Sequence, residues 1–381
     1  MSKEILFIVG NAIYNNDGYK SRIEMEMDLL SFYKLHIFLP RIEGKSIEFR
    51  NDVMVHFYEL NLKKGIIFKV FSIRNFQRSL NKVLYSYEID AVVCEGLGAA
   101  IKAGEVSLKK GIRVIFDCHG TEPDEYYLYH RNFKGYLWSR ILKYFEKRVI
   151  NRCDILLTVS TAQYEKWNPK KKYKHKHFVL PMLPAEHFLN DKSHRDEVRK
   201  KLNIENNTKV YVYSGGNQKW QMSEYMLSVY KKIEETCIDT MLLILSHDVM
   251  EFKKLIQIKQ IKNVKVVSVG YNEMPAYLDA CDFGFCLREN SIVNLVASPT
   301  KVLEYLTRNV KPILTKYVGD YSQQLKEKKL AIVVGEKYKT DIFYKEEDYG
   351  GRDYVIAYRN QIKERYIEFI KTEIEKIKSE D

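Results

Sequence analysis

The stretch that decides the fold reads Ser298-Pro299-Thr300-Lys301-Val302-Leu303-Glu304-Tyr305. Ser298 is a residue type that caps helix N-termini, and Pro299 suits the first helical position, where its missing N–H costs nothing. A helix that begins here would turn free N–H groups and its positive dipole end toward whatever lies in front of it. Lys301 adds a charge in the first turn, and Glu304 lies one turn deeper. An anion and a diol at these two side chains would describe a nucleoside diphosphate and its ribose; the alternative is an ordinary capped helix.

The flanking sequence favours a functional loop in front of this helix. Residues 281–287 form a short apolar run, as expected of a strand that is buried on both faces, and residues 311–315 predict the next strand. Residues 288–297 are then a polar connection. Because ligands of open parallel sheets lie outside the carboxyl ends of the strands, this connection is a candidate ligand-binding segment.

The same strand–helix alternation runs through the chain twice. Expected strands in the first half are 5–9, 36–39, 53–58, 91–94, 113–117, 155–159 and 178–180, with an amphipathic helix from about Ser21. A polar linker with a short helix follows at 183–207. Expected strands in the second half are 210–213, 241–245, 264–269, 283–287, 312–314 and 331–334. A long helix is expected from about 354 to 379. The sequence thus predicts two doubly wound α/β domains with a cleft between them, 1–183 and 184–353, and assigns the C-terminal helix 354–381 to the first.

Composition limits the class of protein. The chain has 381 residues, 45% hydrophobic content and a net charge of +12, so its surface attracts anions: nucleic acid, phosphorylated ligands or an acidic membrane face. We find no helix-turn-helix, zinc-finger or RNA-recognition pattern, so no nucleic-acid partner is expected. The six cysteines form no close pair, which predicts reduced, buried thiols and a cytoplasmic protein without a zinc site. The apolar run 5–9 is too short for a signal peptide, and no run reaches the length of a membrane span.

Several motifs in order resemble one enzyme family. They are Tyr213-Ser214-Gly215-Gly216-Asn217-Gln218-Lys219-Trp220, residues 263–270, 277–282 and Lys311-Pro312 in the second half, and 117–125, 146–149 and 154–160 in the first. With the 298–305 helix they resemble the GT-B glycosyltransferases, in particular family 4 of the bacterial cell-surface polysaccharide type, over about residues 1–335. The resemblance implies two Rossmann-like domains facing a central cleft, with the C-terminal helix crossing back to the first. It also implies transfer of a hexose unit from a nucleotide-diphosphate sugar to a saccharide or lipid-linked acceptor, with retention and without a cofactor or metal.

The resemblance assigns donor contacts to the second half. Gly215 and Gly216 would let the backbone approach a diphosphate, and Lys219 would meet its phosphates; the alternative is a tight turn with a solvated lysine. Glu304 would bind the ribose, and Lys301 with nearby N–H groups would neutralise the pyrophosphate as it leaves. The expected donor-binding residues are Gly215, Gly216, Lys219, Arg288, Asn294, Ser298, Pro299, Thr300, Lys301 and Glu304.

The first half would supply the acceptor side. His119 follows a predicted strand and resembles the family histidine that orients the transferred sugar; the alternative is a structural histidine. Glu122, Asp124 and Glu125 could bind acceptor hydroxyls or be surface charges. Gly10, Asp17 and Gly18 could pass close to the donor phosphates or the acceptor; the alternative is that Asp17-Gly18 is a generic turn. The expected acceptor-binding residues are Gly18, His119, Glu122 and Glu125, and the expected catalytic residues are His119, Lys219, Lys301 and Glu304.

One position departs from the family pattern. Many members have a second glutamate eight residues before the one at Glu304, where this chain has Val296. Arg288, Glu289, Asn290 or Asn294 could replace it, so the identity of the donor sugar stays open. A sugar-nucleotide epimerase of the same fold and a non-catalytic binding protein remain alternatives, as does a nucleic-acid binder supported by charge alone.

Two basic segments suggest an anionic membrane surface as a further partner. Residues 63–78 are apolar and basic without an acidic residue, and residues 170–177 form a second basic run. If this segment and the residues after it are helical, one face carries an apolar stripe of Ile66, Ile67, Val70, Ile73, Phe76, Leu80 and Val83. Such a helix could lie on anionic lipid at the inner membrane face; the alternative is a domain helix whose stripe packs into the core.

Overall fold

The computed structural model describes residues 3–10, 18–43, 47–59, 66–103, 112–169, 176–335 and 350–375. It divides into two compact units, one formed by Met1–Pro181 with Ile362–Asp381 and the other by Met182–Gln361. Each unit is a parallel β-sheet covered by helices on both faces. All six cysteines are free and buried, as predicted.

The first unit is built on a seven-stranded sheet whose strand order is β3-β2-β1-β4-β5-β6-β7. Its strands are β1 (Glu4–Val9), β2 (Lys34–Arg41), β3 (Val53–Glu59), β4 (Ile89–Glu95), β5 (Arg113–Cys118), β6 (Ile155–Thr158) and β7 (Lys176–Val179). All pairings are parallel, and β1 is buried along its whole length, which explains its unbroken apolar sequence. All seven strands expected here are present, with ends that differ by a few residues.

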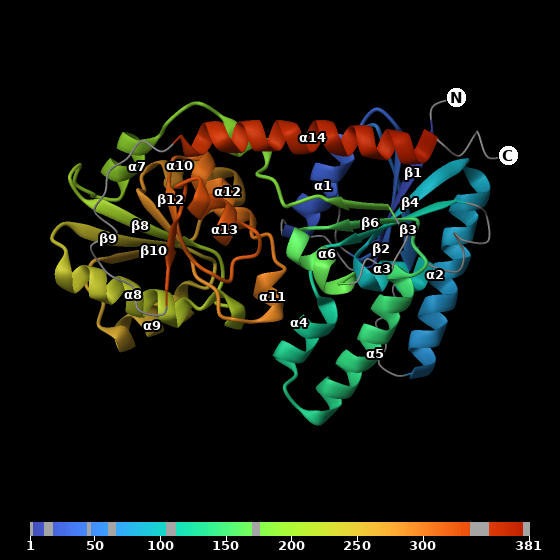
Figure 1. The fold of residues 1–381 in the computed structure, drawn as a ribbon, viewed down its shortest axis with the longest axis horizontal. Helices are drawn as coiled ribbons and strands as arrows, with labels where there is room; N and C mark the ends of the chain where they lie inside the picture. Colours follow the sequence, from blue (N-terminus) through green and yellow to red (C-terminus); the bar gives the residue numbers. More distant parts are fainter. Residues whose placement is uncertain are drawn as a thin grey trace. The chain divides into compact units, whose positions relative to one another are not determined.

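Helices cover both faces of this sheet (Figure 1). They are α1 (Gly18–Leu29), α2 (Ile66–Ser86), α3 (Gly96–Ala103), α4 (Glu122–Tyr129), α5 (Phe133–Ile150), α6 (Thr161–Trp167) and the C-terminal part of α14 (Gly351–Glu375). On one face, Phe76 of α2 and Leu97 of α3 pack into a core with Leu6 and Phe116 of the strands. On the other, the Tyr366 hydroxyl of α14 donates a hydrogen bond to the Glu26 carboxylate of α1.

The second unit repeats the design with six strands in the order β10-β9-β8-β11-β12-β13. They are β8 (Lys209–Ser214), β9 (Thr240–Leu245), β10 (Val264–Val267), β11 (Phe283–Cys286), β12 (Lys311–Thr315) and β13 (Ile332–Val334). Its helices are α7 (Arg195–Lys201), α8 (Ser223–Thr236), α9 (Val249–Lys259), α10 (Met274–Asp279), α11 (Ile292–Leu295), α12 (Thr300–Thr307) and α13 (Tyr321–Glu327), with short 3₁₀ turns η2 (Glu186–Leu189), η3 (Lys219–Gln221) and η4 (Tyr271–Glu273). Helices α8 and α9 pack on one face of the sheet, and α7, α10 and α12 on the other.

Both sheets reverse their strand order at one point. In the first unit the reversal falls between β1 and β4, and in the second between β8 and β11. The loops that leave two such strands run in opposite directions, which opens the sheet edge there to a ligand. The loop after β8 carries Gly215, the loop after β11 carries Arg288, and Glu95 ends β4, so the fold places chemistry-bearing residues at both switch points.

The two segments proposed for a membrane surface have different outcomes. Residues 60–65 and 170–175 lie outside the described residues. Within α2, Phe76, Leu80 and Val83 of the expected stripe are buried in the core, so a lipid contact through these three residues is wrong, whereas Ile73 is 40% exposed. None of the helices in the described ranges combines the length and apolar composition that a bilayer-spanning segment needs.

Candidate active site

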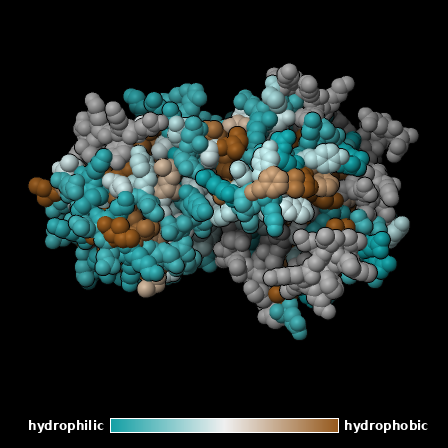
Figure 2. Space-filling view, turned by 90° about the horizontal axis from the view of Figure 1, so that it is seen from below, coloured by the Kyte–Doolittle hydropathy of each residue, from teal (hydrophilic) through white to brown (hydrophobic). Residues whose placement is uncertain are grey.

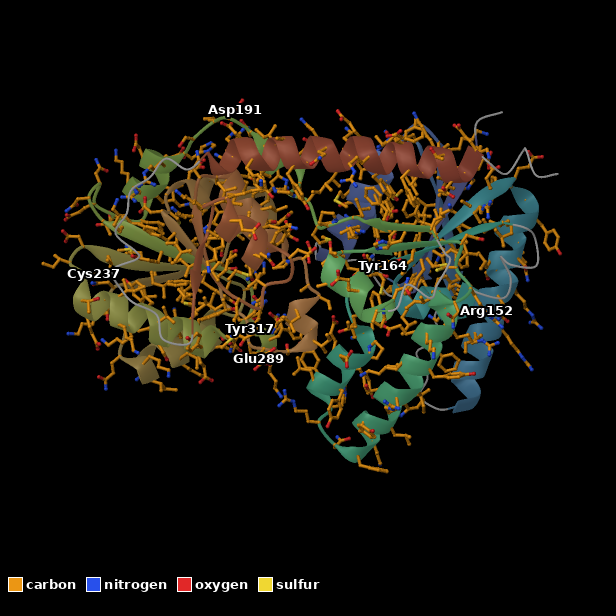
Figure 3. The ribbon with its side chains drawn as sticks, viewed as in Figure 1. Arg152, Tyr164, Asp191, Cys237, Glu289 and Tyr317 are labelled. Atoms are coloured by element: carbon orange, nitrogen blue, oxygen red, sulfur yellow. The ribbon has the colours of Figure 1, made fainter. Side chains whose placement is uncertain are left out.

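The loop between β11 and α12 is more ordered than the expected polar connection. It contains the short helix α11, where the Ser291 side chain accepts a hydrogen bond from the Asn294 N–H. The Asn294 amide donates to the Glu289 carbonyl at 3.2 Å, and the Asn294 carbonyl accepts from Gly319 N–H at 3.2 Å. Since β11 and β12 are parallel neighbours, the loops after them, which carry Glu289 and Tyr317 (Figure 3), leave the same edge of the sheet. Asn294, only 1% exposed, therefore holds this loop in shape.

Helix α12 begins at Thr300, with Pro299 in the cap position. The predicted cap was Ser298, and this is wrong: the Ser298 hydroxyl accepts from the Met182 N–H at 3.2 Å and shares a hydrogen bond with the Tyr321 hydroxyl at 3.0 Å. The Ser298 hydroxyl is thus directed to residues outside the helix, and no side chain in the described part of the protein caps the start of α12.

Lys301, in the first turn of α12, reaches the end of β8. Its ammonium donates to the Ser214 carbonyl and, at 2.7 Å, to the Gln221 amide oxygen, and it lies 4.6 Å from the centre of the Tyr213 ring. Gly215 follows Ser214 with φ of +132°, and a Cβ there would lie 2.8 Å from the Lys301 Nζ. The positive φ favours glycine, and the missing side chain leaves space beside the Lys301 ammonium. Lys301 thus lies at the switch point itself.

A second cation lies near Lys301. Arg288 follows β11 and is buried. Its backbone N–H donates a hydrogen bond to the Thr315 hydroxyl at 2.9 Å. Burial, together with the charge on Arg288, lowers the pKa of Lys301 to about 7. Holding two cations together out of water costs free energy that an anion between them would recover. The switch point therefore has the electrostatics of an anion site.

Glu304 lies one turn further along α12. The Tyr271 hydroxyl donates to its carboxylate at 2.8 Å. Burial raises the pKa of Glu304 to about 7, although the Tyr271 hydrogen bond and the charge on Lys301 oppose the rise. The predicted proximity of Lys301 and Glu304 is present, whereas Tyr271 was missed because one residue in a turn after a strand gives no signal of its own.

The turn after β8 contains Gly215 and Gly216, which were expected to let the backbone approach a diphosphate. The Gly215 N–H donates to the Leu245 carbonyl at 3.0 Å, and the Asn217 N–H donates to the Asp248 carboxylate at 2.7 Å. These two N–H groups thus hold the turn in shape. Gly215 instead makes room for the Lys301 ammonium. Lys219 opens η3 and is exposed to solvent, in the same turn as Gln221.

In the first unit, His119 lies among charged side chains that sequence reasoning did not connect. Its Nε2 is 2.7 Å from an Asp117 carboxylate oxygen and 2.9 Å from a Glu95 carboxylate oxygen. Arg22 of α1 donates to both oxygens of Asp117, at 2.9 and 2.8 Å. Burial by itself lowers the pKa of His119, but Asp117 and Glu95 outweigh it and raise the pKa to about 10. His119 is therefore an imidazolium at neutral pH.

Glu95, Asp117 and His119 are also the one group within the described ranges whose ligand atoms could hold a metal ion. Arg22 already occupies both oxygens of Asp117, and 2.7 Å is the distance of a hydrogen bond from a protonated Nε2. A divalent ion would have to displace that proton beside a buried guanidinium. The expectation that no metal takes part stays a prediction.

The three acidic residues after β5, which were expected in a loop, lie in the first turn of α4 and have structural contacts. The Glu122 carboxylate accepts from the Leu97 N–H at 2.5 Å, at the start of α3, and burial raises its pKa. Asp124 forms ion pairs of 2.6 Å with Lys143 and Lys166. A Cβ on Gly120 would lie 2.6 Å from a Glu125 carboxylate oxygen, so Glu125 covers that glycine. Gly18 begins α1, and Asp17 lies outside the described residues.

Comparison with known proteins agrees with the resemblance seen in the sequence. Residues 32–181 match the family model of Glycosyltransferase Family 4. No curated protein sequence matches the chain significantly.

Solved structures share the fold over nearly the whole chain. Sucrose-phosphate synthase from Thermosynechococcus elongatus superposes with a TM-score of 0.74 at 12% identity, covering 97% of this chain and 98% of that one. HepE from Anabaena in complex with UDP and glucose gives 0.69 at 12% identity, covering 97% and 100%. WaaG, a glycosyltransferase involved in lipopolysaccharide biosynthesis, gives 0.61 at 12% identity, covering 99% and 96%.

The shared fold confirms the predicted GT-B architecture of two Rossmann-like domains. The match to the family model adds that residues 32–181 resemble Glycosyltransferase Family 4.

Proposed function

We propose that this protein transfers a hexose unit from a nucleoside-diphosphate sugar to a saccharide or lipid-linked acceptor, with retention, in the synthesis of a cell-surface glycan. The observation that carries the proposal is the pair of cations at the switch point of the second unit. Lys301 contacts the end of β8, Arg288 follows the neighbouring strand β11, and Gly215, without a side chain, leaves room beside the Lys301 ammonium. HepE, which shares the fold, is known in complex with UDP and glucose, so this architecture is compatible with such a donor.

Lys301 and Arg288 would stabilise the departing diphosphate. As the glycosidic bond breaks, negative charge grows on the phosphate oxygens, and positioned cations stabilise that charge more than they stabilise the ground state. A bound diphosphate would also raise the depressed pKa of Lys301, so that the ammonium is fully charged when charge develops. Glu304, held by Tyr271, would accept hydrogen bonds from two adjacent ribose hydroxyls.

His119 would act on the acceptor side as a fixed hydrogen-bond donor. Asp117 holds its Nε2, so the N–H on Nδ1 is the ring donor left for a sugar hydroxyl. The neighbouring Arg22–Asp117 pair fixes the orientation of the ring, which makes His119 a positioning group with a constant charge. Glu122 and Glu125 stay candidates for acceptor contacts through the oxygens that their structural roles leave over.

Turnover and product analysis test this proposal. A nucleotide sugar is first chosen by a thermal-shift screen with UDP, GDP, CDP, ADP and their sugars, because a ligand at a hundredfold its dissociation constant stabilises the protein by about 2.7 kcal/mol. The chosen sugar is then incubated with the protein, with and without acceptors. We expect slow release of the nucleoside diphosphate alone and faster release with an acceptor. Recovery of an epimerised nucleotide sugar, or binding with no release at all, would contradict the proposal.

A lipid-linked acceptor would bring the protein to a membrane face. We therefore include peripheral binding at an anionic bilayer in the proposed function. The charge of +12 supports it in general terms, but it does not say which surface makes the contact.

A further inference from the structure

Helices α4 and α5 expose an unusual number of large apolar and aromatic side chains. These two helices project as a hairpin from the first unit (Figure 1). The residues, with their exposed fractions, are Phe133 80%, Tyr144 61%, Tyr136 51%, Leu137 51%, Trp138 49%, Tyr129 47%, Tyr127 41% and Phe145 37%. We call these eight residues the hairpin surface. Figure 2, seen from the side on which the hairpin projects, shows apolar side chains exposed among hydrophilic ones.

Helical geometry shows that this exposure is systematic. The small residues Gly135 and Ser139 are buried, and with Glu146 and Ile150 they form the inward face of α5. Phe133, Leu137, Arg140 and Tyr144 lie at spacings of four, three and four residues, which places them in one row on the opposite face. An ordinary surface helix turns its apolar residues inward and its charged residues outward. Here the outward row is mostly apolar, which marks a surface that binds something.

The charge of the exposed side is of one sign. Lys134, Arg140 and Lys147 are exposed on α5, whereas its one acidic residue, Glu146, is buried and accepts a hydrogen bond from Trp167 Nε1 at 3.0 Å.

Two of the three acidic residues of α4 contact backbone or basic groups, and the third, Glu125, lies over Gly120. Glu122 binds the Leu97 N–H, and Asp124 is neutralised by Lys143 and Lys166. The hairpin therefore presents apolar and basic groups together.

We propose that the hairpin surface docks the protein on an anionic lipid bilayer, with α5 lying in the plane of the headgroups. Phe and Leu side chains would enter the acyl boundary, Tyr and Trp would place their polar atoms at headgroup level, and the basic side chains would bind lipid phosphates. A second copy of the hairpin is disfavoured as the partner of this surface, because a two-fold contact would bring the exposed basic residues of both copies together. The proposal rests on the proposed function for its purpose, a lipid-linked acceptor, and on the exposed residues for its location.

Vesicle co-sedimentation of the full chain tests the proposal. Vesicles of phosphatidylcholine alone are compared with vesicles of equal parts phosphatidylcholine and phosphatidylglycerol. We expect the wild type to bind the anionic vesicles and to lose binding at high salt. Since one basic residue near an anionic surface contributes about 1 kcal/mol, the double variant Arg140→Gln with Lys147→Gln should bind about 30-fold more weakly.

Apolar contact is tested separately. Leu137→Ser should weaken binding about tenfold or more, because a buried leucine side chain contributes about 1.5 to 3 kcal/mol. Ile258→Ser is the matched control: Ile258 is 72% exposed on α9 of the other unit, and its loss should leave vesicle binding unchanged. Exposed substitutions of this kind should leave the thermal midpoint of each variant within a few degrees of the wild type, which excludes unfolding as the cause.

Trp138 gives a direct readout. Its emission should shift to shorter wavelength when the wild type meets anionic vesicles, and Trp138→Phe should abolish that shift although Trp167 and Trp220 remain. The proposal is overturned if the wild type ignores anionic vesicles, if Leu137→Ser binds them as the wild type does, or if sedimentation velocity shows self-association that Leu137→Ser abolishes.

The two proposals fail separately. The thermal-shift response to nucleotide sugars is measured without vesicles, and none of the hairpin variants touches the residues at the switch point. Vesicle binding without a nucleotide response would contradict the proposed glycosyl transfer and support the docking surface. A nucleotide response without vesicle binding would support glycosyl transfer and contradict the docking surface.

Discussion

Lys301 is a cation whose charge depends on pH in the physiological range. Burial lowers its pKa to about 7, so above that pH the empty site holds a neutral amine. A diphosphate needs the ammonium, so binding at about pH 8 should take up a proton, and affinity should fall as pH rises further. Below pH 7 the opposite holds for Glu304, whose pKa is raised to about 7: it must lose a proton to bind ribose hydroxyls, so binding releases one.

Calorimetric titration in two buffers of different ionisation enthalpy measures this proton exchange directly. Lys301→Met should abolish the uptake above pH 7 and leave the release below it. A proton count that does not change between about pH 6 and pH 8 would show that neither group meets the ligand.

The Arg22–Asp117 pair is buried, with side chains 1% and 0% exposed, and it has a solvent-exposed counterpart in Arg41–Glu59, at 60% and 74%. Asp117→Asn leaves a buried guanidinium without its counter-ion and should cost about 3 to 5 kcal/mol of unfolding free energy. Arg41→Met should cost less than about 1 kcal/mol. Urea unfolding compares the two, and equal losses would mean that the buried pair contributes no more than a surface pair.

At the scale of elements, the ring of Tyr305 packs α12 closely against the sheet. The Tyr305 hydroxyl accepts from the Ser214 N–H at 2.9 Å, and its ring covers Gly284 of β11 so closely that a Cβ there would lie 2.4 Å away. Gly284→Ala must therefore push α12 off the sheet, at a cost of about 1 to 3 kcal/mol. Because Lys301 lies on the same helix, nucleotide affinity should fall as well.

Gly98→Ala is the control, since an added methyl there meets open space. It should leave both stability and nucleotide affinity close to those of the wild type. If Gly284→Ala behaves like this control, the packing of α12 on β11 does not position Lys301.

How far the sequence predicts these elements depends on how strong the local pattern is. The strands were predictable because runs such as Ile5 to Val9 are buried on both faces. The four-residue helix α11 was not, since a single Ser291 cap in a polar loop looks like any turn. Ser298 was misassigned because its partners, Met182 and Tyr321, are distant in sequence. The α5 surface escaped notice because sequence periodicity alone cannot tell an exposed apolar row from a buried one.

The site residues, too, were predictable where a local motif contains them and were missed where distant segments meet. Lys301, Glu304 and Gly215 were predicted from the order of motifs, and the fold brings the first two together on one helix beside the third. Glu95 and Arg22 were missed because their meeting with Asp117 and His119 depends on strand neighbours, not on spacing. The strand order places β4 beside β5 and thus Glu95 beside Asp117, which the local sequence does not indicate.

At the scale of the whole molecule, the chemistry is attributed to protein cations rather than to a bound ion. Exhaustive treatment with EDTA should therefore leave turnover of the nucleotide sugar unchanged. The control is the same protein with magnesium or manganese restored. Loss of turnover on chelation, with recovery on adding either ion, would show that the Glu95–Asp117–His119 group or another site holds a required metal.

The most direct test of the central claim is a calorimetric titration of the best nucleoside diphosphate into the wild type, Lys301→Met and Lys253→Met. Lys253 is an exposed lysine of α9 and serves as the charge-matched control. Removing a charged hydrogen-bond donor costs about 1.5 to 3 kcal/mol, so Lys301→Met should bind roughly 10-fold to 150-fold more weakly, with Lys253→Met equal to the wild type. Equal affinity in all three proteins would contradict the claim that the start of α12 binds the diphosphate.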